Sequence, residues 1–423
     1  MKAGFAEIDI TPPLGTRKIG WIKEILGDRV HDPLFARAAI FESGRERIAM
    51  IQLDTLSIRW NDTMEIRRRI AEKYGFPADH IMVAATHNHG GPAVASIGDV
   101  KREAQYVESM IQKIVSAFGQ ALEHAQEAEI GLGSVAEFRV GFNRRVIMRD
   151  GTTRTHGNFK DPSALCLEGP VDPELAVLAA RNKKGETLGV LVNFTCHPAH
   201  HGGDTAFSAG WPGVLAAEMK SRGSPCTLLI NGALGNISTS DPTRCTDQSM
   251  EQIGLLLAED VAGLLPKLAW RQDAKLGART RSLALPFRNP TAGEIKGTSR
   301  GTQRFVDPTL YDKHMPDVLR LMKERGTQKA EVQVLFLDEY AFAGIPAELF
   351  VELGLKIKEQ ANPRHALVCG LANGMVGYVP HKAAFLRGGY EATFCGWSKL
   401  APEAGDMLAD CAIELIRAEP LPK

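Results

Sequence analysis

Two histidines separated by a single residue, His87 and His89, are the residues of this sequence best placed for chemistry. They follow an apolar run at residues 80–85 that predicts a buried strand, and the Gly-Gly-Pro at residues 90–92 predicts a turn. A His-x-His pair at the end of a strand can offer one imidazole to a metal ion and hold the second beside it. One turn-capping and one solvent-facing histidine would give the same pattern, so the pair alone does not decide.

Four more predicted strand ends carry groups of the kind found in active sites. His197 follows an apolar run and precedes a proline, and Ser238 lies in a turn rich in glycine and asparagine. Glu348 lies in the first turn of a predicted helix, and Tyr378 lies in a glycine-rich turn. Taken singly, these are explained equally well as a core histidine, an ordinary turn, a carboxylate complementing a helix dipole and a packed ring. Ligands of open α/β sheets bind beyond the carboxyl ends of strands, so the set favours one shared site.

Such a set suits a hydrolytic metal centre. Two neutral imidazoles and one carboxylate can hold Zn²⁺ and leave a position for water. The metal lowers the pKa of that water and polarises a carbonyl group. The sequence contains no G-x-S-x-G motif, which argues against a serine hydrolase of the nucleophile-elbow type. It also has no phosphate-binding loop and no G-x-G-x-x-G fingerprint after a strand, which argues against nucleotide chemistry.

The rest of the chain alternates between strand-like and helix-like segments, as expected of an α/β fold. We expect mixed β-sheets flanked by helices in a single large catalytic domain over residues 1–423, because no flexible linker divides the chain. Residues 288–304 are polar and basic and predict a long loop. The clearest predicted strands are 48–58, 80–85, 175–180 and 188–196 as a hairpin, 226–230, 330–336, 340–344 and 366–369, and the clearest helices are 62–74, 103–125, 211–221, 250–270 and 403–417.

Composition and charge exclude several classes of partner. The 50 basic residues balance the 50 acidic ones, so no strong field attracts nucleic acid or an anionic membrane. No apolar run approaches the roughly 20 residues that span a bilayer, and residues 1–13 do not read as a signal peptide. The seven cysteines are scattered and lack C-x-x-C spacing, which favours reduced thiols. These features predict a cytoplasmic protein; they give no indication of its oligomeric state.

The motifs resemble the catalytic domain of the neutral/alkaline (non-lysosomal) ceramidase family, in the same order along most of the chain. The strand at residues 4–13 with Asp-Ile-Thr-Pro resembles the N-terminal signature of that family, and Thr86–Pro92 resembles its His-Thr-His-Ser-Gly-Pro motif. The other matching segments are 193–198, 235–238, 346–348, and 374–378 with 388–391, and a weaker match at 143–145 resembles a segment near the substrate.

The resemblance implies a zinc ion with four protein ligands, His87, His197, Glu348 and Tyr378. It also implies that His89 lies beside the metal and transfers protons. Ser238 corresponds to a serine near the scissile amide, and Tyr378 or Ser238 would assist the developing oxyanion. The expected reaction is therefore cleavage of an amide (N-acyl) bond by metal-activated water.

Three departures from the family pattern bear on the substrate. Asn236 stands where the family has an aspartate, the Pro-Gly at 212–213 lacks the usual preceding acidic residue, and neither a C-terminal immunoglobulin-like domain nor a secretion signal is expected. With the polar segment 288–304, these departures predict a small, water-soluble substrate. The alternatives are a ceramidase proper acting on N-acylsphingosine, an esterase on the same centre, and a non-catalytic protein that binds a metal or ligand.

Overall fold

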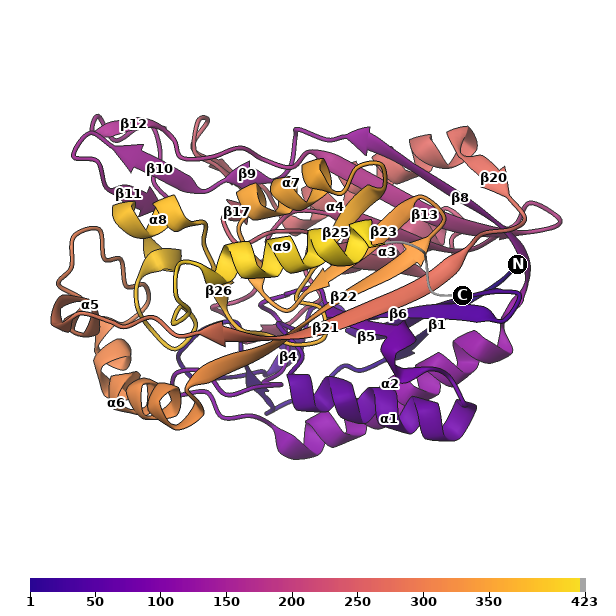
Figure 1. Cartoon of the computed structure of the whole chain (residues 1–423), viewed down its shortest axis with the longest axis horizontal. Helices are drawn as coiled ribbons and strands as arrows, with labels where there is room; N and C mark the ends of the chain where they lie inside the picture. Colours follow the sequence, from indigo (N-terminus) through magenta and orange to yellow (C-terminus); the bar gives the residue numbers. More distant parts are fainter. Residues whose placement is uncertain (419–423) are drawn as a thin grey trace.

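A nine-stranded mixed sheet forms the larger half of the structure, a computed structural model that describes residues 1–418 (Figure 1). The pairs β14–β16 and β6–β7 are parallel, and the other pairs of this sheet are antiparallel. The strands in spatial order are β16 (Thr227–Asn231), β14 (Thr187–Phe194), β13 (Glu174–Asn182), β8 (Gln126–Ala136), β1 (Lys2–Asp9), β5 (Phe35–Ser43), β6 (Glu46–Leu53) and β7 (Ile81–Ala85), and β20 (Ala269–Arg271) pairs with β8.

A second sheet of four strands packs against one face of the first. Its order is β21 (Leu276–Pro286), β22 (Thr327–Leu337), β23 (Tyr340–Ile345) and β25 (His365–Gly370), and the β23–β25 pair is parallel. Apolar side chains of both sheets form one core between them, among them Phe41 and Leu228 from the large sheet and Phe342 from the small one. Burial of this interface is the main force that holds the sheets together.

Helices cover the outer face of each sheet and complete four layers. Helices α1 (Trp60–Tyr74) and α2 (Ala104–Glu123) pack on β5–β7, and α3 (Trp211–Ser221) and α4 (Met250–Leu264) pack near β13, β14 and β16. Helices α7 (Val351–Gln360) and α9 (Ala404–Arg417) cover the small sheet, which is visible where the yellow α9 crosses it in Figure 1. The predicted α/β class with mixed sheets and flanking helices is confirmed. The predicted single domain over 1–423 extends past the described residues and stays a prediction.

The segment predicted as a long loop contains a short helix. Helix α5 (Ala292–Lys296) begins at a capping box in which Thr291 and Glu294 exchange hydrogen bonds, and α6 (Pro308–Arg325) follows it. No described helix combines the length and the apolar character needed to cross a membrane. The remaining elements are β2 (Arg17–Lys18), β3 (Ile25–Leu26), β4 (Arg29–Val30), β9 (Phe142–Asn143), β10 (Arg145–Met148), β11 (Thr153–Thr155), β12 (Ala164–Leu167), β15 (Ala206–Phe207), β17 (Ile237–Ser238), β18 (Ser240–Asp241), β19 (Thr246–Asp247), β24 (Glu348–Leu349), β26 (Tyr378–Val379), α8 (Lys382–Arg387) and short 3₁₀ turns at 78–80, 265–267 and 390–392.

Candidate metal centre

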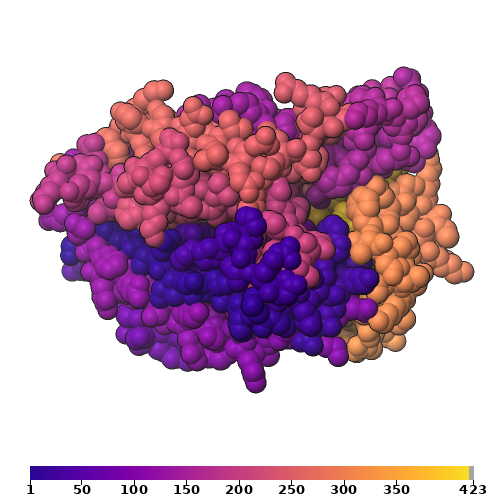
Figure 2. Space-filling view, turned by 180° about the vertical axis from the view of Figure 1, so that it is seen from behind, coloured from indigo at the N-terminus to yellow at the C-terminus, as the bar shows by residue number. Residues whose placement is uncertain are grey.

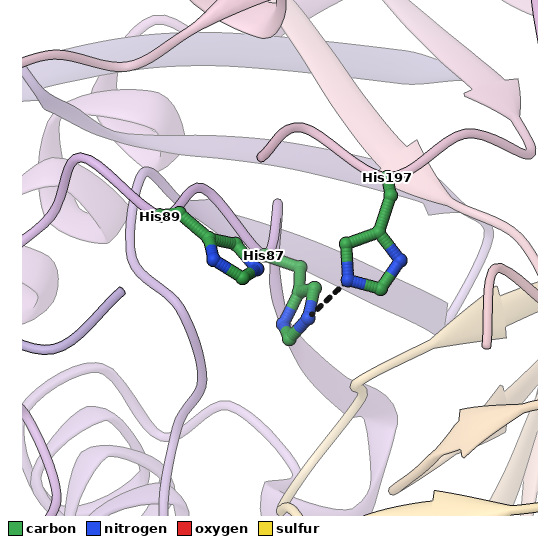
Figure 3. A group of neighbouring side chains, drawn as sticks. All are labelled: His87, His89 and His197. Carbon is green, nitrogen blue, oxygen red and sulfur yellow. Dashed lines mark hydrogen bonds between the residues drawn. The ribbon is translucent and has the colours of Figure 1, made fainter. Parts of the chain in front are cut away.

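His87 and His197 meet where β7 and β14 end. His87 follows β7 with a left-handed backbone (φ 67°), a conformation that costs energy in a non-glycine residue and is concentrated at functional sites. His197 follows β14, which lies next to β16, the edge strand at the other end of the large sheet's strand order. Their Nε2 atoms lie 3.1 Å apart, and Figure 3 shows the two rings converging from separate segments. The predicted association of these two histidines is therefore present in the structure.

The hydrogen bonds on the far side of each ring fix the state of these nitrogens. Nδ1 of His87 lies 2.7 Å from the carbonyl oxygen of Leu56, and Nδ1 of His197 lies 3.3 Å from that of Leu234. A carbonyl can only accept, so each Nδ1 carries a proton, and in the neutral imidazole that binds a metal Nε2 then presents the lone pair. Burial lowers the pKa of His197 well below its usual range, which keeps that ring neutral. Two lone pairs facing each other at 3.1 Å fit a cation between them.

Glu348 supplies a carboxylate to the same point. Its Oε2 lies 3.1 Å from Nε2 of His87 and 3.6 Å from Nε2 of His197, and it is buried without a hydrogen-bond partner among the described residues. Ligand atoms on a tetrahedral zinc, at bonds of about 2.0–2.1 Å, lie roughly 3.4 Å from one another, so these separations suit such a metal. Two imidazole nitrogens and one carboxylate oxygen are also ligand types that zinc commonly binds.

The predicted helix at Glu348 is wrong, and the correction explains how the carboxylate is held. Glu348 lies in the two-residue strand β24, which pairs in parallel with β26, and helix α7 begins only at Val351. In this register Glu348 is the direct partner of Tyr378. The turn 231–238 presses closely on β24: a Cβ added at Gly235 would lie 2.5 Å from the carbonyl oxygen of Glu348. Glycine is therefore required there.

His89 lies beside the other two histidines rather than away in solvent. Its Nδ1 donates to the carbonyl oxygen of Gly20 at 2.9 Å, and its Nε2 is buried with no partner in residues 1–418. One ring nitrogen each of His87, His89 and His197 lie within 4.8 Å of one another. Burial, reinforced by His87, lowers the pKa of His89 to about 3, so the ring is neutral with an accepting nitrogen. By geometry His89 is both a candidate ligand and a candidate base.

Tyr378 lies next to Glu348 and is held by a buried arginine. A guanidinium nitrogen of Arg144 donates to the hydroxyl oxygen of Tyr378 at 3.2 Å, and Nε of Arg144 pairs with Glu391 at 2.8 Å. Burial, with the negative charge of Glu348, raises the pKa of Tyr378 well above its usual value. Burial opposes the charge on Glu391, but Arg145 and Arg144 outweigh it and hold the pKa of that carboxyl at about 2. The weak sequence match at 143–145 thus contains a residue that belongs to the site.

Ser238 lines the cavity onto which the metal centre opens, and its hydroxyl makes little contact with the protein. It lies on β17, paired with β9, and its hydroxyl reaches the carbonyl oxygen of Ser240 at 3.5 Å. Asn236 takes part in holding the turn instead: its Oδ1 accepts from the backbone of Val351 at 2.8 Å, and its amide donates to Glu352 at 2.9 Å. An aspartate could not donate to Glu352, which accounts for an amide at this position in this chain.

A cavity of about 780 Å³ opens onto these groups. Figure 2 shows a hollow bordered by indigo, magenta and orange parts of the chain with yellow residues at its floor, the same parts that supply the lining. Sequence reasoning missed much of this lining, because its residues carry no local motif. They include Trp21, His156, Asp247, Phe305 and Trp397, whereas Tyr390 lies in the segment 388–391 that resembles a family motif. His200 lines it too, whereas His201 pairs with Asp204 at 2.7 Å.

The fold and the centre define an α/β protein with a buried histidine and carboxylate site at strand ends. Residues 2–210 match the family described as neutral/alkaline non-lysosomal ceramidase, N-terminal. The chain is 25% identical over 464 residues to the neutral ceramidase of Pseudomonas aeruginosa, covering 91% of this chain and 67% of that protein. The crystal structure of neutral ceramidase from that organism superposes with a TM-score of 0.74 at 19% identity, covering 100% of this chain and 76% of that one. A ceramidase complexed with C2 gives 0.73 at 17% identity, with the same shares covered.

Residues 2–210 therefore belong to the neutral/alkaline non-lysosomal ceramidase family, a family of amide hydrolases. The resemblance inferred from the sequence motifs is confirmed at this level. The structural likeness, at under 25% identity, concerns the fold. The roles of the individual site residues remain those argued from the geometry above.

Proposed function

We propose that this protein is a zinc-dependent hydrolase that cleaves the amide bond of a small, water-soluble N-acyl compound. The observation that carries the proposal is the convergence of three buried acceptor atoms, Nε2 of His87, Nε2 of His197 and Oε2 of Glu348. A zinc ion held there would lower the pKa of a water molecule and polarise the carbonyl of the substrate. The family supports an amide as the bond cleaved.

The residues around the centre divide the remaining work. Neutral His89 lines the cavity with its ring centroid 5.1 Å from that of His87, and its unpartnered Nε2 can take a proton and return it to the leaving amine. Tyr378, as the fourth ligand that the resemblance implies, lies beside Glu348 and is oriented by Arg144, so its hydroxyl is positioned to assist the developing oxyanion. Ser238 has a hydroxyl free to hydrogen-bond the substrate.

Turnover of simple N-acyl compounds, measured before and after chelation, tests the proposal. We expect a chelator to abolish turnover and stoichiometric zinc to restore it. An unaffected rate would refute metal dependence, and turnover of simple esters but not of amides would favour the esterase alternative. Tight zinc binding without turnover of either substrate would favour a non-catalytic binding protein.

The preferred length of the acyl chain of the substrate is tested separately. We expect short N-acyl compounds to be cleaved faster than long-chain ceramide presented in detergent, as the polar and basic composition of residues 288–304 predicts. Faster cleavage of ceramide would restore N-acylsphingosine as the substrate.

We also propose a cytoplasmic location, supported by the free state of all seven cysteines. Cell fractionation with an antibody to the chain tests it, and recovery in a secreted fraction would contradict it.

A further inference from the structure

A second cavity, of about 530 Å³, adjoins the catalytic cavity and has no part in the chemistry proposed above. The two cavities share apolar wall residues, among them Ile22, Leu56, Tyr311 and Trp397. A chain bound in the second cavity can therefore extend into the first. Because these residues come from distant parts of the sequence, the junction has no local signature.

One face of α6 forms a wall of this second cavity along most of the helix. Leu310, His314, Val318, Leu321 and Arg325 follow the three- and four-residue spacing of a single helix face, and all line the cavity. Tyr311, which lines both cavities, is separated from Arg325 by about 21 Å of helix at about 1.5 Å per residue. The space is thus elongated, with apolar walls, and suits an extended hydrocarbon chain.

Three cationic side chains, Arg59, Arg325 and Lys399, line the same cavity. None of them forms a salt bridge with a carboxylate in residues 1–418. Lys399 donates to the carbonyl oxygens of Gly396 at 2.8 Å and Val376 at 3.4 Å, which leaves one of its three N–H groups unused.

The other titratable lining groups do not neutralise these cations. His314 pairs with Asp99 at 2.7 Å. Asp317, whose side chain is largely exposed, accepts from Arg320 at 3.0 Å. Burial lowers the pKa of Lys399 to about 8, with the positive charge of Arg325 contributing in the same direction, so the ammonium remains mostly protonated at neutral pH. A ligand that brings a negative charge would relieve this repulsion.

We propose that the cavity along α6 binds a linear apolar chain that ends in an anionic group, with the anion between Arg59, Arg325 and Lys399 and the chain directed toward the catalytic cavity. We identify this ligand as the chain of the N-acyl substrate itself, an assignment that rests on the proposed function. An anionic end would keep such a substrate soluble in water, while its hydrocarbon part would fill the apolar walls.

Calorimetric titration with three probes of equal chain length tests the binding site without relying on turnover. We expect dodecanoate to bind at least ten-fold more tightly than dodecanol, and dodecylammonium to bind more weakly than either. The titration is run on the protein as isolated and again after chelation, so that a carboxylate held by the metal centre is recognised. Equal affinity for the three probes, or dodecanoate binding that disappears on chelation, would overturn the proposal.

Substitutions at the cationic end locate the anion. Arg325→Gln combined with Lys399→Met should reduce dodecanoate affinity about ten-fold and leave dodecanol affinity unchanged, which also shows that the variant is folded. Lys323→Gln, on the same helix but exposed and outside the cavity lining, is the matched control and should bind dodecanoate like the wild type. Loss of dodecanoate binding in the control, or none in the double variant, would refute the assignment.

Kinetics then separate the two sources of an anionic chain. If the ligand is the substrate, N-dodecanoyl compounds carrying a terminal carboxylate should show about a ten-fold lower KM than their methyl-ended counterparts, and the Arg325→Gln, Lys399→Met variant should lose this preference with kcat unchanged. Anion-selective binding without this preference would refute the substrate assignment and identify a separate fatty-acid-like ligand. Absence of any turnover would refute the proposed function, while the titrations would still decide the site.

Discussion

The two walls of the catalytic cavity are built differently. On one wall, His87, His197 and Glu348 stand at the ends of buried strands, and each is fixed by backbone contacts on its far side. The other wall includes Val306 and Tyr311, at the start of α6. Apolar packing holds this helix, its ion pairs with other elements, such as Lys313–Asp99, are exposed, and Val306 has a left-handed backbone. Exposed pairs contribute little to stability. The first wall therefore fixes atoms for chemistry, and the second is the one that can adjust to a substrate.

The largest effect is expected where the rigid wall loses a ligand. His197→Ala should lose the bound zinc, about one ion per chain in the wild type, and reduce turnover to background, because only His87 and Glu348 would remain of the three main donors usual in a catalytic site, with Tyr378 as a weaker fourth. Elemental analysis and turnover of the purified variant check this. Equal zinc content in the two proteins would remove His197 from the ligand set.

The buried network behind the rigid wall should matter for stability as well. Glu391→Ala leaves Arg144 and Arg145 without their shared carboxylate, and loss of one partner of a buried pair costs about 3–5 kcal/mol of unfolding free energy. Denaturant titration measures it. Glu324→Gln, which removes an exposed pair with Arg320 on α6, is the control and should leave the unfolding midpoint unchanged. Similar losses in both variants would show that the walls do not differ as described.

His89 belongs to the same rigid wall, but we expect it to transfer protons and not to bind the metal. His89→Ala should keep most of the zinc and lose roughly 100-fold in turnover, the usual scale for a general acid–base group. Metal analysis alongside kcat distinguishes a base from a ligand. If the variant loses the metal, the ligand set is the three histidines that lie within 4.8 Å of one another, and Glu348 has another role.

The smallest effect is expected at Ser238, which has one weak hydrogen bond. Ser238→Ala should slow turnover by less than His89→Ala does, because the serine assists by hydrogen bonding and forms no covalent intermediate. Mass spectrometry of the wild type during turnover checks the second point. An acyl adduct on Ser238 would contradict this role.

The residues of the two walls also differ in how far their positions could be predicted from the sequence. Strand ends with His87 and His197 are local patterns, so the fold class and the placement of these histidines at strand ends were predictable from the sequence, whereas the ligand set came from the resemblance to the family. Glu348 was predicted as part of the site but on the wrong element, since a two-residue strand paired with Tyr378 has no periodicity to detect. The cavity along α6 was not predictable, because residues such as Leu56, Val318 and Trp397 become neighbours only in the folded chain.

The facing lone pairs of the centre have a consequence for the stability of the whole chain. Nε2 of His87, Nε2 of His197 and Oε2 of Glu348 repel one another unless a cation lies among them. The unfolded chain has no such arrangement, so a metal that binds the centre binds the native state preferentially. Mass action then adds about 2.7 kcal/mol to the unfolding free energy at a free metal concentration of 100 times Kd. The melting temperature of this protein should accordingly report the zinc supply of its surroundings.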